Sequence, residues 1–296
     1  MENKLKFSQK HPLLFGFGLI LTAVVLIIGA MAVFYSYFSP SGLRSFFATR
    51  VGVVNITGLI TDSRKITSWI NQLRDDDSIA GVIVRINSPG GVVGPSQEIY
   101  SAIKRLANKK KVVVSMGAVA ASGGYYIACA AHKIVANPGT LTASIGVKAQ
   151  LTNFAELMKK IGIKEQTITS GKLKNAGTPF RPLTDEEKKY FQTLVNDLHA
   201  QFVNDVAASR HMDIKQVKKL ADGRAMTGRQ AKDAGLVDEL GGFDKALEIL
   251  RSLARIKGKI SLVEGPPEKF SLVEKILGKL TFKEQTLGPQ WIFTYE

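Results

Sequence analysis

The chain has 296 residues, 45% of them apolar, enough to bury the core of one large domain or two ordinary ones. This composition excludes a mainly disordered chain. The formal net charge of +15 indicates an anionic partner. The basic residues are scattered, and no run of them alternates with aromatic residues that could stack on bases. The charge therefore favours contact with acidic lipid head groups over nucleic-acid binding.

The amino terminus carries Lys4, Lys6 and Lys10 before an uncharged stretch at 13–38. As a helix this stretch would measure roughly 39 Å, enough to cross a ~30 Å hydrocarbon layer. The lysines before it and the aromatic residues at its far end predict a single-pass anchor in the inner (plasma) membrane. The amino end would be cytoplasmic and the remaining chain extracytoplasmic. A cleaved signal peptide is the alternative, because residues 30–32 (AMA) have the small-x-small form that would be cut after Ala32.

Beyond a short junction, apolar runs alternate with helical patterns. The patterns predict strands at 51–56, 81–87, 111–116, 133–138 and 143–147, and helices at 62–74, 95–107, 122–132, 185–210 and 271–280. Thr184 with Glu187 three residues later marks the start of the long helix. Strands that are apolar on both faces and separated by helices predict an α/β fold with a largely parallel sheet covered on both sides.

Metal, nucleotide and thiol chemistry find little support. The chain has no His-Glu-x-x-His pair, no cluster of Cys and His, and no phosphate loop, so no cofactor or metal is expected. The one cysteine, Cys129, lies among alanines and is interpreted as a small buried hydrophobe. A Ser-His-Asp triad would have to use His199 or His211, and both are better explained as surface or packing residues.

Ser122 is the strongest candidate nucleophile. It opens a predicted helix, where unpaired N–H groups and the helix dipole favour a developing oxyanion. The upstream turn in "INSPGG" could expose further N–H groups through Gly90 and Gly91. Each motif alone could be a helix cap or a simple turn. Ala120 stands where a nucleophile elbow has its first glycine, which weakens an α/β-hydrolase interpretation.

A serine without a histidine needs another base, and a lysine held among apolar groups can serve. The segment "TITSGKLKNAGTPF" offers Lys172 and Lys174 about fifty residues beyond Ser122. Spacing alone does not choose between them.

Five motifs occur in one order, namely "INSPGG", "AASGGYYIA", "ASIGV", "SGKLKNAGTPF" and "MTGRQAKDAGLVDELGG". In this order, and with the anchor before them, the chain resembles the signal peptide peptidase A family of bacterial membrane-anchored Ser-Lys endopeptidases. The resemblance spans about 51–260. It implies a Clp-protease/crotonase-like fold of repeated strand-strand-helix turns, with Ser122 as nucleophile and Lys174 as general base and acid. Asn175 departs from the family, which often has Asp or Ser there.

The resemblance also implies the backbone N–H groups of Gly91 and Gly123 as oxyanion donors. Ser144 and Ile145 fall in a groove-lining stretch and receive no catalytic role. One copy of the catalytic unit matches the half-length members, which implies a ring-shaped homo-oligomer whose serine and lysine come from adjacent subunits. The implied substrates are remnant signal peptides or other apolar peptides.

The expected organisation is a cytoplasmic basic terminus at 1–12, an anchor at 13–38, a linker at 39–50, a Ser-Lys protease domain at 51–264 and a tail at 265–296. A non-catalytic membrane scaffold of the same fold, with Ser122 as a helix cap, is the alternative function. Acyl-CoA chemistry on the related crotonase fold would fit the glycine turns but leaves the anchor and the serine-lysine pair unexplained.

Overall fold

The computed structural model describes residues 11–38, 48–267 and 293–295. The chain divides into two compact units, residues 1–48 and 49–296. In the first unit, helix α2 (Pro12–Phe38) is apolar all round, with no acidic residue in its first turn and no basic residue in its last. Its residues Pro12–Phe34 are long and apolar enough to cross a membrane. The predicted helix at 271–280 lies outside the described residues.

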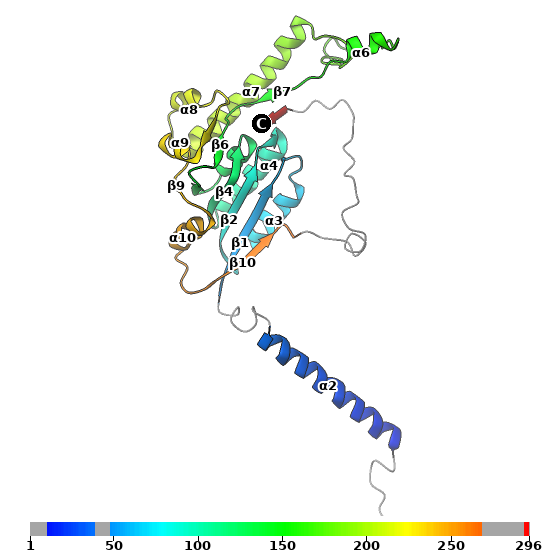
Figure 1. The fold of residues 1–296 in the computed structure, drawn as a ribbon, viewed down its shortest axis with the longest axis vertical. Coiled ribbons are helices and arrows are strands. Elements are labelled where there is room, and N and C mark those ends of the chain that lie inside the picture. Colours follow the sequence, from blue (N-terminus) through cyan, green and yellow to red (C-terminus); the bar gives the residue numbers. More distant parts are fainter. Residues whose placement is uncertain (1–10, 39–47, 268–292, 296) are drawn as a thin grey trace, which may run out of the picture. The chain divides into compact units, whose positions relative to one another are not determined.

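A parallel sheet forms the centre of the second unit, in the order β10-β1-β2-β4-β5-β9 (Figure 1). Its strands are β1 (Thr49–Thr57), β2 (Ile79–Ser88), β4 (Lys111–Ala121), β5 (Lys133–Ala136), β9 (Glu239–Leu240) and β10 (Ile260–Gly265). Each neighbouring pair runs parallel. The carboxyl end of β4 also pairs with β6 (Leu141–Ala143), which continues antiparallel to β8 (Ala225–Thr227).

Helices cover both faces of this sheet. Successive strand residues point to opposite sides, so each face carries apolar side chains that pack against helices. One face, with Val51, Ile83 and Val113, packs against α10 (Phe243–Leu253). The other face, with Val82 and Val112, packs in one core with the remaining large helices. These are α3 (Arg64–Asp75), α4 (Val93–Ala107), α5 (Gly123–Ala128) and α7 (Asp185–Arg210). The predicted α/β class and two-sided covering are confirmed.

Shorter elements complete the unit. They are β3 (Gly91–Val92), β7 (Lys148–Ala149), α6 (Ala155–Lys160), α8 (Ile214–Leu220), α9 (Gly228–Asp233) and β11 (Phe293–Tyr295). Strand β11 lies between β3 and β7 in a separate three-stranded sheet.

The predicted elements lie close to their observed bounds, with two corrections. The capping box that starts α7 is present, since the Thr184 hydroxyl accepts the Glu187 N–H. The strand predicted at 143–147 is wrong, because β6 ends at Ala143. Ala143 and Ser144 have φ of 61° and 50°, a left-handed conformation that cannot continue a strand. The helix predicted at 122–132 already ends at Ala128.

Candidate active site

Ser122 sits at the sharp junction between β4 and α5. Its φ of 53° and ψ of −114° lie outside the regions that a side chain favours. Two backbone hydrogen bonds hold this conformation. The Ser122 N–H donates to the Ala143 carbonyl at 2.8 Å, and its own carbonyl accepts the Tyr126 N–H at 2.8 Å. Strained residues of this kind persist where the surrounding structure fixes them, and they cluster at functional sites.

The Ser122 hydroxyl is buried without a hydrogen bond. The residue is fully inaccessible, and its Oγ has no partner within the described part of the chain. A buried polar group without a partner costs about 1–3 kcal/mol. Ser122 does not act as a helix cap either, since its side chain accepts no N–H from α5. The structure therefore leaves this oxygen available for another group.

The two predicted oxyanion residues, Gly91 and Gly123, lie side by side, and Gly123 directly follows Ser122 in the chain. A Cβ atom on Gly123 would be 3.2 Å from the Gly91 amide nitrogen and 2.7 Å from Ser96 Oγ. A Cβ atom on Gly91 would meet the Ile60 carbonyl oxygen at 2.2 Å. The Gly123 N–H belongs to the first turn of α5, where no intrahelical acceptor is available. Both positions thus require glycine.

Two buried serines, Ser88 and Ser96, shape this glycine turn and were missed by the sequence analysis. Ser88 Oγ accepts the Gly90 N–H at 3.1 Å, and Ser96 Oγ donates to the Val92 carbonyl at 2.9 Å. Ser88 stands in "INSPGG", so its place before the glycines was the available signal. Ser96 becomes a neighbour of Gly123 only through the packing of α4 on α5.

Ser144 and Ile145, which the sequence analysis assigned to a groove-lining stretch, lie close to the backbone of Ser122. Ser144 is nearly buried and Ile145 fully so. The Ser144 hydroxyl donates to the Gly223 carbonyl at 3.1 Å. Ser144 follows Ala143, the acceptor of the Ser122 N–H, so this strained pair helps to hold the backbone of Ser122.

The histidines bind backbone groups instead of Ser122. His199 Nε2 lies 2.9 Å from the Ala221 carbonyl oxygen, and His132 Nδ1 accepts the Val112 N–H at 3.2 Å. His211 caps the end of α7 in a left-handed conformation. These contacts agree with packing roles.

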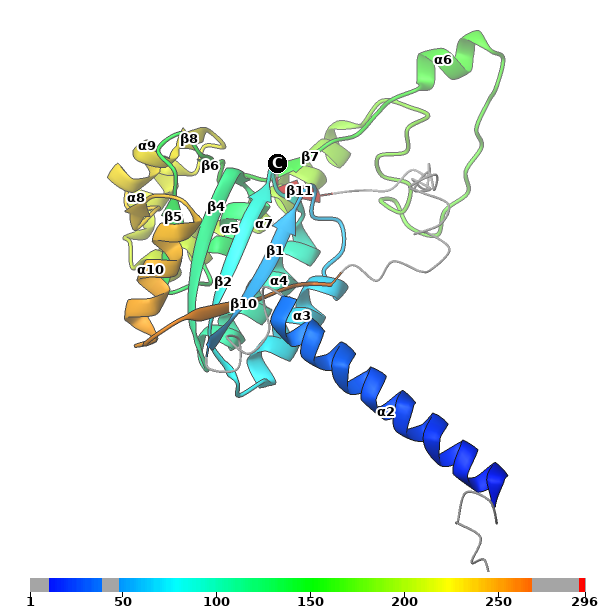
Figure 2. The ribbon, with the colours of Figure 1, turned by 60° about the horizontal axis from the view of Figure 1, so that its bottom comes forward.

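Both candidate lysines lie on the segment between β7 and α7, which we call the arm (residues 150–184). The arm projects from the body of the unit (Figures 1 and 2). Lys172 forms an ion pair with Glu186 at 2.6 Å. Lys174 is exposed, and its ammonium group has no ion pair or hydrogen bond to any described residue. The single chain therefore does not join Lys174 to Ser122.

The arm exposes many apolar side chains. Ile168 is 92% exposed, the highest value among them. The others that are largely exposed are Phe154, Leu157, Ile161, Ile163, Leu173 and Phe180. A concentration of apolar surface of this kind marks an interaction site.

The last described strand, β11, lies along the edges of β3 and β7 beside the glycine turn. Strand β11 pairs antiparallel with β3, Tyr295 opposite Gly91, and antiparallel with β7, Thr294 opposite Lys148. In Figure 1 this end of the chain lies beside β7. The edges of β3 and β7 thus accept an extended segment directly beside the proposed oxyanion turn.

Other reactive groups offer little chemistry. Burial raises the pKa of the Cys129 thiol to about 12. Within residues 11–38, 48–267 and 293–295, no group of three or more His, Cys, Asp or Glu could hold a metal ion.

Known proteins match most of the unit that carries this site. Residues 104–257 match the profile of Peptidase family S49. The chain is 39% identical over 233 residues to a candidate protease of Synechocystis sp., covering 77% of this chain and 83% of that protein. It is 39% identical over 186 residues to a candidate signal peptide peptidase SppA of Enterococcus faecium, covering 62% of this chain and 53% of that protein. It therefore spans about half the length of the latter.

Among solved structures, a mutant ClpP1 from Listeria monocytogenes matches with a TM-score of 0.46 and 20% sequence identity. That match covers 66% of this chain and 94% of the ClpP1 chain.

Proposed function

The chain belongs to peptidase family S49, and we propose that it is a membrane-anchored serine endopeptidase with a Ser122–Lys174 dyad. Its proposed substrates are remnant signal peptides or other apolar peptides after their release. The observation that carries the proposal is the Ser122 hydroxyl, which is buried, unpartnered and held on a strained backbone next to Gly91 and Gly123.

The proposed chemistry is acyl transfer through an ester on Ser122. Lys174 accepts the Ser122 proton while Oγ attacks the peptide carbonyl, and it then returns that proton to the leaving amine. The carbon–nitrogen bond breaks as the ester forms. Lys174 next takes a proton from water, whose oxygen attacks the ester carbonyl. As the bond between the acyl carbon and Oγ breaks, Lys174 gives this proton to Oγ, which restores the Ser122 hydroxyl. The acid product leaves as a carboxylate after losing its proton to solvent. The N–H groups of Gly91 and Gly123 would stabilise the negative oxygen in both steps.

A second copy of the chain would supply the lysine. Among the described residues of one chain the Ser122 hydroxyl has no partner, and Lys174 stands on the projecting arm. The exposed apolar residues of the arm favour its docking against another subunit. A ring in which each arm reaches the next subunit would bury this surface and complete every site. A lone subunit would then be inactive.

Strand addition is the proposed mode of substrate binding. A peptide that takes the place of β11 would pair with the backbone of β3 and β7 and present a carbonyl near Gly91. Main-chain hydrogen bonds of this kind bind many sequences, while side-chain pockets select among them. This suits an enzyme that degrades varied apolar segments.

Helix α2 supports the membrane placement. Its apolar stretch has a mean hydropathy of 2.7 over Pro12–Phe34, and the three lysines before it favour a cytoplasmic amino end. The catalytic unit would then lie outside the inner membrane, where released signal peptides emerge.

Cleavage of a fluorogenic apolar peptide by the detergent-solubilised protein tests the proposal. Wild type is compared with Ser122→Ala, Lys174→Ala and Lys172→Ala, each checked for intact assembly. We expect Ser122→Ala and Lys174→Ala to lose activity and Lys172→Ala to keep it. Equal cleavage by all four proteins, or by none, would overturn the dyad and favour a peptide-binding scaffold.

A further inference from the structure

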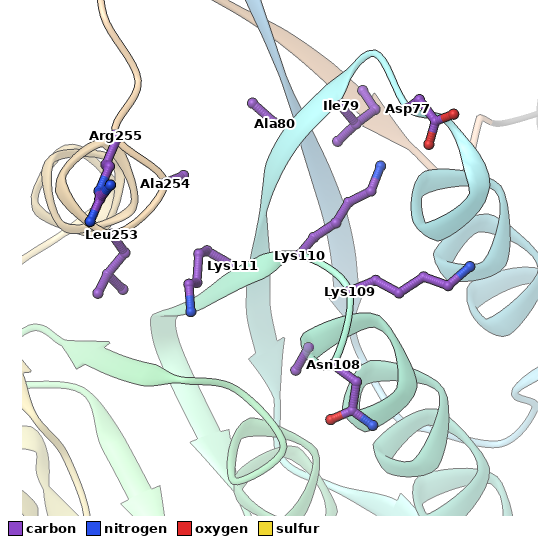
Figure 3. Close-up of a pocket in the computed structure, with 11 residues that line it drawn as sticks. Asp77, Ile79, Ala80, Asn108, Lys109, Lys110, Lys111, Leu253, Ala254 and Arg255 are labelled. Carbon is purple, nitrogen blue, oxygen red and sulfur yellow. The ribbon is translucent and has the colours of Figure 1, made fainter.

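A basic hollow lies at the amino-terminal end of the parallel strands. Ser122 lies at the opposite, carboxyl-terminal end. The hollow, about 410 Å³, is formed by the turn from α4 to β4, the start of β2 and the end of α10. Lys109, Lys110 and Lys111 extend in different directions from one turn, and Arg255 lies across the hollow just past the end of α10 (Figure 3). Asp77 is the one carboxylate that lines it.

Two of the lysines around the hollow have a partner, and other basic side chains at this end of the sheet have none among the described residues. Lys109 pairs with Asp75 at 3.3 Å, and Lys110 Nζ donates to the Asp76 carbonyl. Within the described ranges, Lys111 and Arg255 form no ion pair, and the same holds for Lys257 and Lys259, which lie in the loop just after α10. All four side chains are exposed and free to meet an anion.

The hollow lies where the chain enters the second unit, because both are at the amino-terminal ends of the parallel strands. The parallel strands start together, with Thr49 of β1 opposite Ile260 of β10, and Gly81 of β2 opposite Lys111 of β4. Residues 39–48 alone join α2 to Thr49, a tether of at most roughly 40 Å when fully extended. Ser122 follows the last residue of β4, so it lies at the opposite, carboxyl-terminal end of the strands.

We propose that this basic edge, with Lys111, Arg255, Lys257 and Lys259 at its centre, binds the anionic head groups of phospholipids in the membrane that α2 spans. The inference rests on the anchoring part of the proposed function. Lysine and arginine side chains close to an anionic bilayer are attracted to it, and a short tether keeps their local concentration high. Such contact would direct the Ser122 edge away from the bilayer.

Amine labelling of the full-length protein in vesicles tests this binding. The protein is reconstituted in phosphatidylcholine alone, or with about 30% phosphatidylglycerol so that the surface is anionic. A water-soluble acetylating reagent is added, and mass spectrometry follows each lysine. We expect Lys111, Lys257 and Lys259 to react several-fold more slowly in the anionic vesicles, with normal rates restored by high salt. The exposed lysines of α8, Lys215, Lys218 and Lys219, should react alike in both.

A charge-reversed variant and a matched control make the test specific. Lys111→Glu/Arg255→Glu/Lys259→Glu should lose the protection of Lys257, whereas Lys215→Glu/Lys218→Glu/Lys219→Glu should keep it. Equal labelling of the basic edge in both vesicle types would overturn the proposal. So would equal protection of the α8 lysines, which indicates non-specific attraction. Protection by inorganic phosphate in neutral vesicles would identify a free-anion site instead.

Two separate assays report the membrane anchor and the protease activity. Flotation of the protein with vesicles after an alkaline wash reports the anchor, and peptide cleavage reports the dyad. A protein that floats and cleaves peptide but shows no protection would overturn only the lipid site. A protein that fails to float would overturn both the anchor and this inference, whatever its cleavage activity.

Discussion

The amide nitrogen of Gly91 lies 3.2 Å from the point that a Cβ atom would take on Gly123. The Gly123→Ala substitution should therefore push against both the oxyanion turn and Ser96 Oγ. Alanine keeps the backbone N–H, but the displaced turn should no longer direct it at the substrate oxygen. We expect the peptide cleavage rate to fall by about 100-fold, the usual effect of losing an oxyanion donor. Steady-state cleavage of the fluorogenic peptide measures this.

Gly94→Ala is the matched control, because a Cβ atom there meets nothing within 4 Å. It should leave the cleavage rate close to that of wild type. Melting curves of both variants separate a local effect from unfolding. If Gly123→Ala kept most of the wild-type rate, the assignment of its N–H as an oxyanion donor would be wrong.

Lys174 and Ser122 should complement each other across subunits. Subunits carrying Ser122→Ala and Lys174→Ala are each expected to be inactive alone. When the two are co-expressed with different tags and purified through both, random mixing in a ring gives about a quarter of the sites an intact pair. Cleavage should return to about that fraction of the wild-type rate. A mixed oligomer with no activity would instead show that serine and lysine act within one chain.

Strand β11 should lower the peptidase activity, because it occupies the edges of β3 and β7, where the substrate is proposed to bind. Ending the chain after residue 292 is expected to raise kcat/KM for a short peptide several-fold. Thr294→Pro keeps the length but removes a backbone N–H from the strand, so it should act in the same direction. A synthetic peptide with the last four residues should inhibit the shortened enzyme. Unchanged rates in both variants would show that β11 does not compete with substrate.

Regular elements could be predicted from the sequence because local patterns determine them. The apolar run of β4 and the capping box before α7 carry their own signals, and both are observed. The place of Ser122 at the start of α5 could also be predicted, whereas its role as nucleophile stays a prediction. The resemblance to a known family, more than spacing, distinguished Lys174 from Lys172.

The remaining features depend on contacts between distant segments. The left-handed conformation of Ala143 and Ser144 follows from hydrogen bonds to Ser122 and Arg224, which no local pattern reveals. Residues 293–295 are of types that favour strands, but three residues are too few to predict one, and their partners β3 and β7 are distant in the sequence. Within the described residues no side chain bonds the Ser122 hydroxyl, so the identity of its base stays a prediction.

Cys129 should be inert in the folded protein. Burial raises the pKa of its thiol to about 12, so almost no thiolate is present at pH 8. Iodoacetamide at pH 8 is expected to leave the native protein unmodified and to label it fully in guanidinium chloride. Rapid labelling of the native protein would contradict the buried position of α5.

Stability in acid should depend on Glu187 at the junction of the arm and α7. Hydrogen bonds from Arg181, with one from the Thr184 N–H, lower the pKa of Glu187 from 4.5 to about 2. A lowered pKa means that the stabilisation is complete above the ordinary value near 4.5 and disappears as the pH falls toward 2. Glu187→Gln keeps a side chain that can accept the capping hydrogen bond but removes the charge. It should cost about 1 kcal/mol or more at pH 7.

Melting temperatures of wild type and Glu187→Gln from pH 7 down to pH 3 check this expectation. The gap should be widest at neutral pH and should narrow below about pH 4.5, because the unfolded wild-type chain then binds a proton at Glu187 that the folded chain still excludes. Glu186→Gln is the matched control in the same helical turn, since its half-exposed side chain pairs with Lys172 at the surface. That variant should differ little from wild type at any pH. A gap for Glu187→Gln that stayed constant down to pH 3 would show that its charge does not stabilise the fold.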